Sequence, residues 1–428
     1  MTSFSLCLFM ILFNYSTVLE ASSQDMHTIA RQTLEKNIVD LPSGSYVSAG
    51  GLHFGSLWTR DFAWAVGGLL AIDKQHVVKN HIQVLLNNTN ENNLIPRVLD
   101  SSPSWARVFM GILKRPISKL RDPLRPEFKG EHGTVAIDSN LLILRSSILY
   151  FKATQDHSFW QENEVNWTKL LKYYDPVQWQ GWIVQENYGD WQDSVKRKGV
   201  SFLTNYLWWE VRDELLSLYS EEQTNKLFGF DQADQDVLLS KLWQSFFDEN
   251  FGLFKSHLST SVISLDGNLL ALLNENFIEQ SQKLNLTTKR GETAQEIYLN
   301  LKRSPLWSGQ PLPGRASWPN YPASWRSFAT RAVGLHHYHD AMVWSWLTGF
   351  SLKLAHKMGD EQEVSRILRI LDQTVKRDQG ITEIWRPNAS LDAFKSLFYR
   401  SENPFSWGAG VILEALASIE KRQIPKRP

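Results

Sequence analysis

Two kinds of helical segment alternate along this chain, and this alternation limits the folds open to it more than any other feature. The first kind is apolar almost all round or carries apolar residues at helical spacing, and it comprises residues 61–72, 137–151, 201–218, 341–355 and 405–419. The second kind is amphipathic and comprises residues 75–86, 235–247, 293–301 and 360–375. No run of residues alternates convincingly as a strand would. The sequence therefore predicts an all-α protein in which an inner ring of buried helices lies inside an outer ring of half-exposed ones.

The domain organisation follows from length and composition. No linker or low-complexity run divides the 428 residues, 43% of which are hydrophobic, so we expect residues 24–428 to form a single domain with a large core. Within residues 1–23, the apolar run 4–13 is too short to span a bilayer and is followed by Ala21, Ser22 and Ser23. This pattern is typical of a signal segment and predicts a secreted or periplasmic protein. Because the segment contains no lysine or arginine, a buried N-terminal helix is the alternative.

Charge and cysteine content exclude several classes of function. Lys+Arg and Asp+Glu both number 45, so no net field attracts a polyanion, and we expect a neutral partner and no nucleic acid. The one cysteine, Cys7, lies in the predicted signal segment, which leaves the rest of the chain without disulfides, a thiolate nucleophile or cysteine metal ligands. We expect a monomer that uses no cofactor or metal and has no integral membrane span once the signal segment is removed.

Residues 185–194 (QENYGDWQDS) combine acidic and aromatic side chains in a way that suits sugar chemistry. The segment holds Glu186, Asp190 and Asp193 beside Tyr188 and Trp191. Aromatic faces offer an apolar platform to a sugar ring, and a partly desolvated carboxyl group can stay protonated near neutral pH and protonate a leaving oxygen. An ordinary helix N-terminus with aspartate as its cap is the alternative interpretation.

Other conspicuous polar and aromatic residues stand at or just before the starts of the predicted apolar helices. They occur at residues 58–61, 138–140, 188–194, 266–268 and 338–340. If the N-termini of the inner helices gather at one end of the ring, these side chains meet at a common mouth, where the helix N–H groups also favour carboxylates.

Four stretches, taken in chain order, resemble the inverting glycosidases of the six-hairpin (α/α)6-barrel type, most closely the glucosidase domain of glycogen-debranching enzymes and their bacterial relatives. The matching stretches are LWTRDFAWAVGGLL, GDWQDS, YHDAMVWSWLTGF, and ITEIW followed by FSWGAGVILEAL. The resemblance covers roughly residues 50–418. It implies a toroid of six helical hairpins and hydrolysis of a neutral, glucose-containing oligo- or polysaccharide. The chain departs from the family pattern at Ser345, where proline is usual, and at residues 406–408, which leaves the substrate open.

Inverting hydrolysis needs one protonated carboxyl group beside the glycosidic oxygen and one carboxylate that holds a water on the opposite face of the sugar. The family motif assigns the general acid to Asp193, with Asp190 as its rival. Glu383 is the predicted general base, because it lies between apolar neighbours, Ile381 and Ile384, that suit a buried, poised carboxylate. An unremarkable loop acid is the alternative for Glu383.

The predicted substrate-binding residues are of three kinds. Arg60 and Asp61 suit a hydroxyl clamp, in which a carboxylate accepts two hydroxyl bonds and a guanidinium holds it or donates to another hydroxyl. His339 and Asp340 can also form hydrogen bonds with hydroxyls. The predicted apolar platform comprises Trp58, Trp191, Trp344 and Trp385, with Asp190 as its acidic neighbour. The group His336, His337 and His339 invites a zinc interpretation, but it lacks the i, i+4 pair and third ligand of zinc enzymes.

Two other classes of function remain open. A sugar-binding protein on the same barrel would keep the aromatic residues but would not need both Asp193 and Glu383. A phosphorylase replaces the base with a phosphate site, and a polysaccharide lyase typically needs a Tyr/His pair and arginines that bind uronates. The presence of Glu383 and the neutral charge balance argue against these last two.

Overall fold

The computed structural model describes residues 25–115, 119–130, 132–286 and 293–423. Six of its helices form a closed inner ring in which each packs against the next. In chain order these are α2 (Thr59–Ala71), α5 (Ser139–Thr154), α8 (Phe202–Leu218), α11 (Leu265–Leu273), α15 (Ser345–Lys357) and α17 (Ser406–Gln423). The ring closes because α17 packs against both α15 and α2. The predicted signal segment, residues 1–23, lies outside the described residues.

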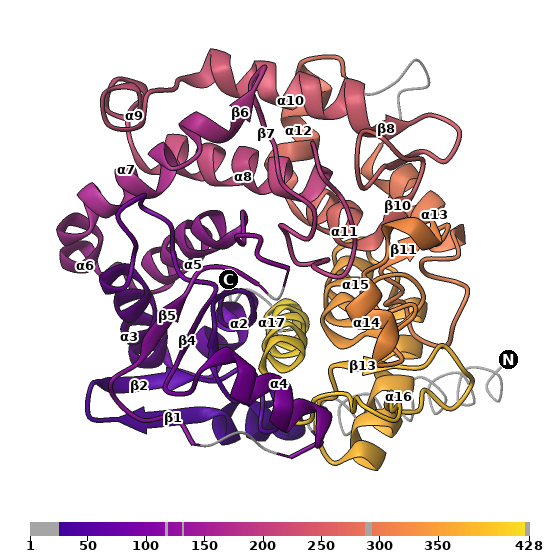
Figure 1. Ribbon diagram of the computed structural model, residues 1–428. Coiled ribbons are helices and arrows are strands. Elements are labelled where there is room, and N and C mark those ends of the chain that lie inside the picture. The colour runs from indigo at the N-terminus through magenta and orange to yellow at the C-terminus, as the bar shows by residue number, and fades with distance from the viewer. Residues whose placement is uncertain (1–24, 116–118, 131, 287–292, 424–428) are drawn as a thin grey trace, which may run out of the picture.

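Amphipathic helices surround this ring (Figure 1). They are a helix that includes residues 25–36, then α3 (Gln75–Asn87), α6 (His157–Glu162), α7 (Glu164–Lys172), α9 (Glu221–Phe228), α10 (Gln232–Phe246), α12 (Glu275–Lys283), α13 (Ala294–Arg303) and α16 (Glu361–Asp378). The first of these pairs with the last inner helix of the chain, since Asn37, just after it, donates to Ser406 Oγ at 2.8 Å. The predicted all-α architecture of six helical hairpins is confirmed.

Short antiparallel strands, which the sequence did not reveal, connect the helices. The longest pair is β1 (Ile38–Leu41) and β2 (Gly44–Val47). The others have two or three residues each: β3 (Leu57–Trp58), β4 (Val98–Asp100), β5 (Arg125–Glu127), β6 (Gln178–Trp179), β7 (Trp182–Ile183), β8 (Phe247–Asp248), β9 (Leu253–Phe254), β10 (Ile263–Ser264), β11 (Ser317–Trp318), β12 (Val343–Trp344) and β13 (Ile384–Trp385). Segments this short show no alternation to detect. Because β3, β10 and β12 run directly into α2, α11 and α15, they fix where these inner helices begin.

Buried asparagines repeat at the starts of three inner helices. Asn205 on α8 and Asn268 on α11 each donate to the carbonyl four residues earlier, at 2.9 and 2.8 Å. Each also binds the backbone N–H and C=O of one residue in the preceding hairpin, Ile183 and Phe254 respectively. Asn140 on α5 accepts in the same way from the backbone of Ile95. The amides thus satisfy buried backbone groups that would otherwise be left without partners.

Glycines bring α2 and α17 close together. A Cβ atom on Gly68 would lie 2.3 Å from the carbonyl oxygen of Gly410, and one on Gly410 would lie 2.4 Å from Ala65 Cα. Neither position therefore has room for a side chain, and the backbones of the first and last inner helices touch. This contact holds the two ends of the ring together.

Two helices and two 3₁₀ turns lie outside this double ring. They are α4 (Ser104–Ile112), α14 (Phe328–Ala332), η1 (Asp175–Val177) and η2 (Ala323–Trp325). Both α4 and α14 contribute residues to the pocket described next.

Candidate active site

A pocket of about 320 Å³ lies at the N-terminal end of the inner helices. Its walls come from the start of α2, the loop before α8, the segment before α15, the loop after α16 and the start of α17. The structure brings into it eight of the residues that the sequence singled out: Trp58, Arg60, Asp61, Trp191, Asp193, His339, Trp344 and Glu383. Residues more than 300 positions apart in the chain thus share one site.

Asp193 lies in a compact loop and not at a helix N-terminus. The loop is closed by Tyr188 N–H, which donates to the Val195 carbonyl at 3.2 Å, and α8 begins only at Phe202, after the N-cap residue Ser201. Tyr188 has a φ of 65°, an uncommon value for an aromatic residue, and its ring stacks on His132 at 3.9 Å. The alternative in which an aspartate of this segment caps a helix is therefore wrong.

Two arginines hold one oxygen of Asp193. Arg60 Nη1 and Arg97 Nη2 each lie 3.3 Å from Oδ2, while the side chain is 33% exposed toward the pocket. Arg60 is itself fixed, since its Nε donates to Asp138 at 2.9 Å and its Nη2 to the Gly189 carbonyl at 3.1 Å. Arg60 was expected to bind sugar hydroxyls, but its guanidinium donates to Asp138, to Asp193 and to the loop that carries Asp193.

Glu383 is buried at the wall of the pocket and is held by three donors. Oε1 accepts from the Tyr338 hydroxyl, and Oε2 accepts from the Tyr399 hydroxyl at 2.5 Å and from the Glu402 N–H at 3.1 Å. A carboxylate has about four lone-pair positions, so one position on Oε1 is not used by any described residue. Burial raises the pKa of Glu383, and the two tyrosine hydrogen bonds oppose this rise. The arrangement suits a carboxylate that accepts one further hydrogen bond.

Asp61 is the third carboxyl group in the pocket. No side chain among the described residues donates a hydrogen bond to it. Desolvation and the charge of Glu383 raise the pKa of Asp61 to about 8, although Arg60 lowers it in part. The Asp61 carboxyl group is therefore largely protonated at neutral pH, and its hydrogen-bonding capacity is available to a ligand.

Aromatic rings form the inner walls. Trp344 stacks on His339 at a centroid distance of 5.4 Å and meets Trp191 edge to face at 5.3 Å. His339 Nδ1 lies 2.7 Å from Ser194 Oγ, and burial lowers the pKa of His339 well below its ordinary value, so the ring is neutral. Trp58 is half-buried, with the Arg97 guanidinium 4.7 Å above its ring.

Three predicted site residues do not reach the pocket. Asp190 is buried in an ion pair with Arg197, whose charge lowers the pKa of the carboxyl group although burial alone would raise it. Asp340 is also buried, where it accepts from the Tyr321 N–H at 2.9 Å. Trp385 is fully buried and donates to Asp378 at 2.8 Å. The structure therefore does not place these three side chains in the pocket, and each has a partner elsewhere in the chain.

Other pocket residues were missed. Tyr338 lies in one of the motifs at the helix starts. Tyr399 and Arg97 carry no local signal, because their partners, Glu383 and Asp193, lie 16 and 96 positions away in the sequence. Trp407 lines the pocket, and its indole N–H is buried without a partner among the described residues. A polar ligand could accept from this group. The departure from the family pattern at residues 406–408 pointed to this segment without giving it a role.

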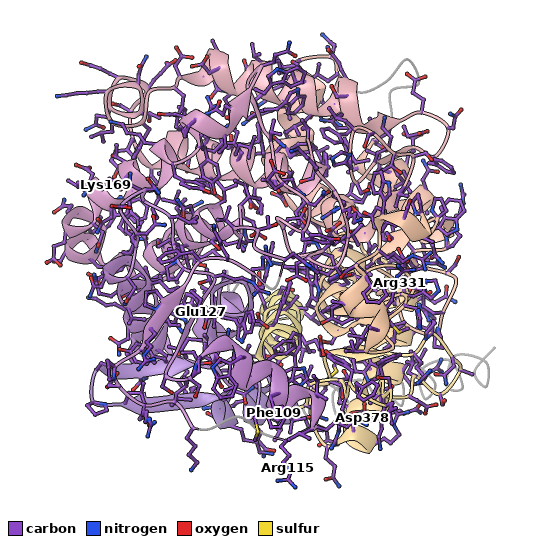
Figure 2. All side chains as sticks on the ribbon, viewed as in Figure 1. Phe109, Arg115, Glu127, Lys169, Arg331 and Asp378 are labelled. Atoms are coloured by element: carbon purple, nitrogen blue, oxygen red, sulfur yellow. The ribbon has the colours of Figure 1, made fainter. Side chains whose placement is uncertain are left out.

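The outer rim of the pocket is apolar. Ile112 at the end of α4 and Phe398 line it and are 42% and 43% exposed. Along α4 the side chains of Trp105 and Phe109 are also exposed, and Figure 2 shows Phe109 near the lower edge of the molecule. Lys114, just after α4, donates to the Ser396 carbonyl at 2.8 Å, which ties α4 to the loop of Phe398. The pocket is thus charged inside and apolar at its entrance.

In the described part of the chain, no three histidine, cysteine, aspartate or glutamate side chains are grouped so that they could hold a metal ion. No described helix is both long enough and apolar enough to cross a bilayer.

Comparison with known proteins shows the fold. No model of a protein family matches the chain, and no curated protein sequence matches it significantly. Among solved structures, a rhamnosidase from Klebsiella oxytoca with rhamnose bound superposes with a TM-score of 0.60 at 12% identity, covering 94% of this chain and 64% of that one. A GH63 mannosylglycerate hydrolase from Thermus thermophilus gives 0.57 at 11% identity, covering 91% and 99%. A glycosidase in complex with glucose gives 0.59 at 11% identity, covering 93% and 98%. The chain has the six-hairpin fold of these glycoside hydrolases.

Proposed function

We propose that this protein is an inverting glycoside hydrolase that acts on a neutral, glucose-containing oligo- or polysaccharide. The observation that carries the proposal is the surroundings of Glu383, a buried carboxylate with one open acceptor position in the same pocket as Asp193. A general base for hydrolysis needs such a position, because it must bind one water and take its proton. A protein that only binds sugar has no need of it.

In the proposed reaction the sugar ring lies against the aromatic walls and Asp61 accepts or donates hydrogen bonds to its hydroxyl groups. Asp193 donates a proton from Oδ1 to the glycosidic oxygen, while Arg60 and Arg97 hold Oδ2 in place. Glu383 removes a proton from a water, which attacks the anomeric carbon as the bond to the leaving oxygen breaks. One proton enters the leaving group and one leaves the water, and the anomeric configuration inverts.

Asp61 is a second candidate for the acid. Arg60 and Arg97 both donate to Oδ2 of Asp193, so the proton that Asp193 gives to the leaving group must be carried on Oδ1. Asp61, whose pKa is raised to about 8, is already protonated at neutral pH. We assign the acid to Asp193 because it stands in the segment that resembles the acid motif of the family and its side chain is 33% exposed.

The dependence of activity on the leaving group distinguishes the acid, the base and the substrate-binding residue. We expect Asp193→Asn to lose about 10²–10⁴-fold in kcat/KM on oligosaccharides, the usual value of a positioned acid, but to recover much of this loss on glucosides with activated aryl leaving groups. Glu383→Gln should lose activity on both classes, since water activation is still needed. Asp61→Asn should mainly raise KM. If Asp61→Asn, and not Asp193→Asn, regains activity on the activated aryl glucosides, the acid is Asp61. If the wild-type protein binds oligosaccharides but releases no product, it is a sugar-binding protein.

A further inference from the structure

A second cavity, of about 560 Å³, lies on the outer side of α8. It is bounded by the ends of α7 and α9, by η1, and by α10. Among the described residues, none lines both this cavity and the candidate active site. The chemistry proposed above does not use it.

Arg212 on α8 is an unpartnered cation in this cavity. Its side chain lies over the rings of Phe230 and Trp208, with the guanidinium carbon 4.3 and 5.4 Å from their centroids. The residue is only 8% exposed, yet none of the described residues forms a hydrogen bond or ion pair with its guanidinium, and Nε is buried without a partner. The terminal nitrogens are open to the cavity. Burial lowers the pKa of Arg212 to about 10, although the charges of Asp234 and Asp231, which form no hydrogen bond or ion pair with it, raise the pKa in part; the group is still charged at neutral pH.

The other buried arginines of the described chain each have a carboxylate partner. Arg60 pairs with Asp138, Arg107 with Asp100 and Arg197 with Asp190, and Arg97 pairs with Asp193. A buried charge without a partner destabilises the protein. Arg212 departs from this pattern in a cavity large enough for a small ligand, which indicates that its partner is not part of the chain.

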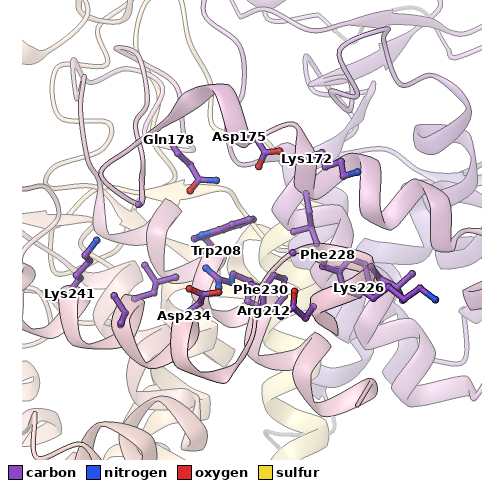
Figure 3. Close-up of a pocket in the computed structure, with 17 residues that line it drawn as sticks. Lys172, Asp175, Gln178, Trp208, Arg212, Lys226, Phe228, Phe230, Asp234 and Lys241 are labelled. Atoms are coloured by element: carbon purple, nitrogen blue, oxygen red, sulfur yellow. The ribbon is translucent and has the colours of Figure 1, made fainter. Parts of the chain in front are cut away.

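The charges around the cavity agree with a negative partner. The lining includes the cations Lys172, Lys226 and Lys241 in addition to Arg212, against the carboxylates of Asp175 and Asp234. Asp234 is engaged in the capping box at the start of α10 and does not pair with Arg212. Figure 3 shows Trp208, Arg212 and Phe230 together in the middle of the pocket, with Lys226 and Lys241 at opposite sides.

We propose that this cavity is a binding site for a small anionic ligand, whose carboxylate or phosphate group pairs with the guanidinium of Arg212. The planar guanidinium donates two parallel hydrogen bonds to such a group, and the rings below leave its edge free to do so. The lysines add long-range attraction, and the apolar side chains of Phe228 and Val237, which also line the cavity, accommodate the non-polar part of the ligand.

Calorimetric titration of the full chain tests this proposal, with chloride at matched ionic strength in every cell. The probes are inorganic phosphate, glucose 6-phosphate and glucuronate, with glucose as the neutral control. We expect saturable binding of a phosphate or a carboxylate probe and none of glucose, and the stronger probe identifies the anion. Arg212→Met should weaken this binding by about tenfold or more, the effect of losing one charge-assisted pair, whereas Lys283→Met, outside the cavity, should not change it.

Melting temperatures provide a second test of the proposal if the anion binds too weakly for calorimetric titration. Without anion, Arg212→Met should melt at the same temperature as the wild type or higher, because the substitution removes an unpaired buried charge. Added phosphate should raise the melting temperature of the wild type but not that of Arg212→Met. No saturable binding of any anionic probe, or equal binding and equal stabilisation in Arg212→Met, would overturn the proposal. Neither measurement depends on glycosidase activity, so the anion-binding site and the proposed function are tested independently.

Discussion

At the scale of single residues, the proposed function depends on how the protein controls three carboxyl groups in one pocket. Glu383 is held by Tyr338 and Tyr399, Asp193 by two arginines, and Asp61 by no side chain among the described residues. Their environments differ, because the tyrosine donors favour the ionised form of Glu383, which suits a base, whereas desolvation favours the neutral form of Asp61.

Tyr399→Phe tests the tyrosine hydrogen bonds to Glu383. The Tyr399 hydroxyl stabilises the charged carboxylate, so its removal should raise the pKa of Glu383 further above its ordinary value. The base must be ionised, and the acid limb of the kcat/KM profile should therefore move to higher pH. Tyr150→Phe, whose hydroxyl bonds Asp156 far from the pocket, should leave the profile unchanged. An acid limb that does not move in Tyr399→Phe would remove Glu383 from the role of base.

Asp61→Asn tests the raised pKa of Asp61 through stability. The folded-state pKa is about 8 and the ordinary value is 3.8, so the folded protein binds more protons than the unfolded chain between these pH values. The contribution of Asp61 to stability is fully present below about pH 4 and is lost as pH rises through about 8. Urea unfolding at pH 5 and pH 8 should show a smaller difference in Asp61→Asn than in the wild type. Exposed Glu249→Gln serves as the control, and an unchanged difference in Asp61→Asn would contradict the account.

The sequence predicted the identity of these residues better than their surroundings. Asp61, Asp193 and Glu383 were found because each stands in a stretch that resembles a family motif. Tyr399 and Arg97 were not, because each acts on a carboxyl group that only the fold brings near. The same reason explains the differences from the prediction, since nothing local shows that Asp190 is occupied by Arg197 or Trp385 by Asp378.

At the scale of elements, the starts of the inner helices are fixed by side chains that bind the backbone of the preceding hairpin. The long helices were predicted to within a few residues, because burial all round or on one face gives a strong period. Most of the strands could not be predicted, because two or three residues carry no period. The sequence also missed α4, although it is nine residues long. The positions of the inner-helix starts matter for function, since the pocket is built on them.

Asn268→Ala tests this anchoring. The substitution leaves the buried N–H and C=O of Phe254 without their side-chain partner, and an unsatisfied buried group costs about 1–3 kcal/mol. We expect a loss of stability of this size in denaturant unfolding. Asn250→Ala, at an exposed position, should cost much less. Equal effects of the two substitutions would show that the repeated asparagines do not anchor the helices.

At the scale of the whole molecule, the closed ring determines that acids from distant parts of the chain share a pocket. Alternation of apolar and amphipathic helices predicted the ring, and the placement of motifs at helix starts predicted a common mouth. The sequence predicted neither the anionic site proposed at Arg212 nor the apolar rim of α4. Both are recognised only when the fold shows that these side chains have no partner in the chain or are exposed. The glycosidase fold is shared by enzymes with different substrates, so the reaction must be tested on the protein itself.

The anomeric configuration of the first product tests the central claim most directly. Hydrolysis of a panel of α-glucosides and oligosaccharides should be followed by proton NMR within the first minutes, before the released sugar equilibrates between its anomers. If Glu383 activates a water and does not attack the sugar, an α-linked glucoside must release β-glucose, and Glu383→Gln must release none. Release of α-glucose first, or a sugar covalently trapped on Glu383, would contradict the inverting mechanism and the roles assigned to Asp193 and Glu383.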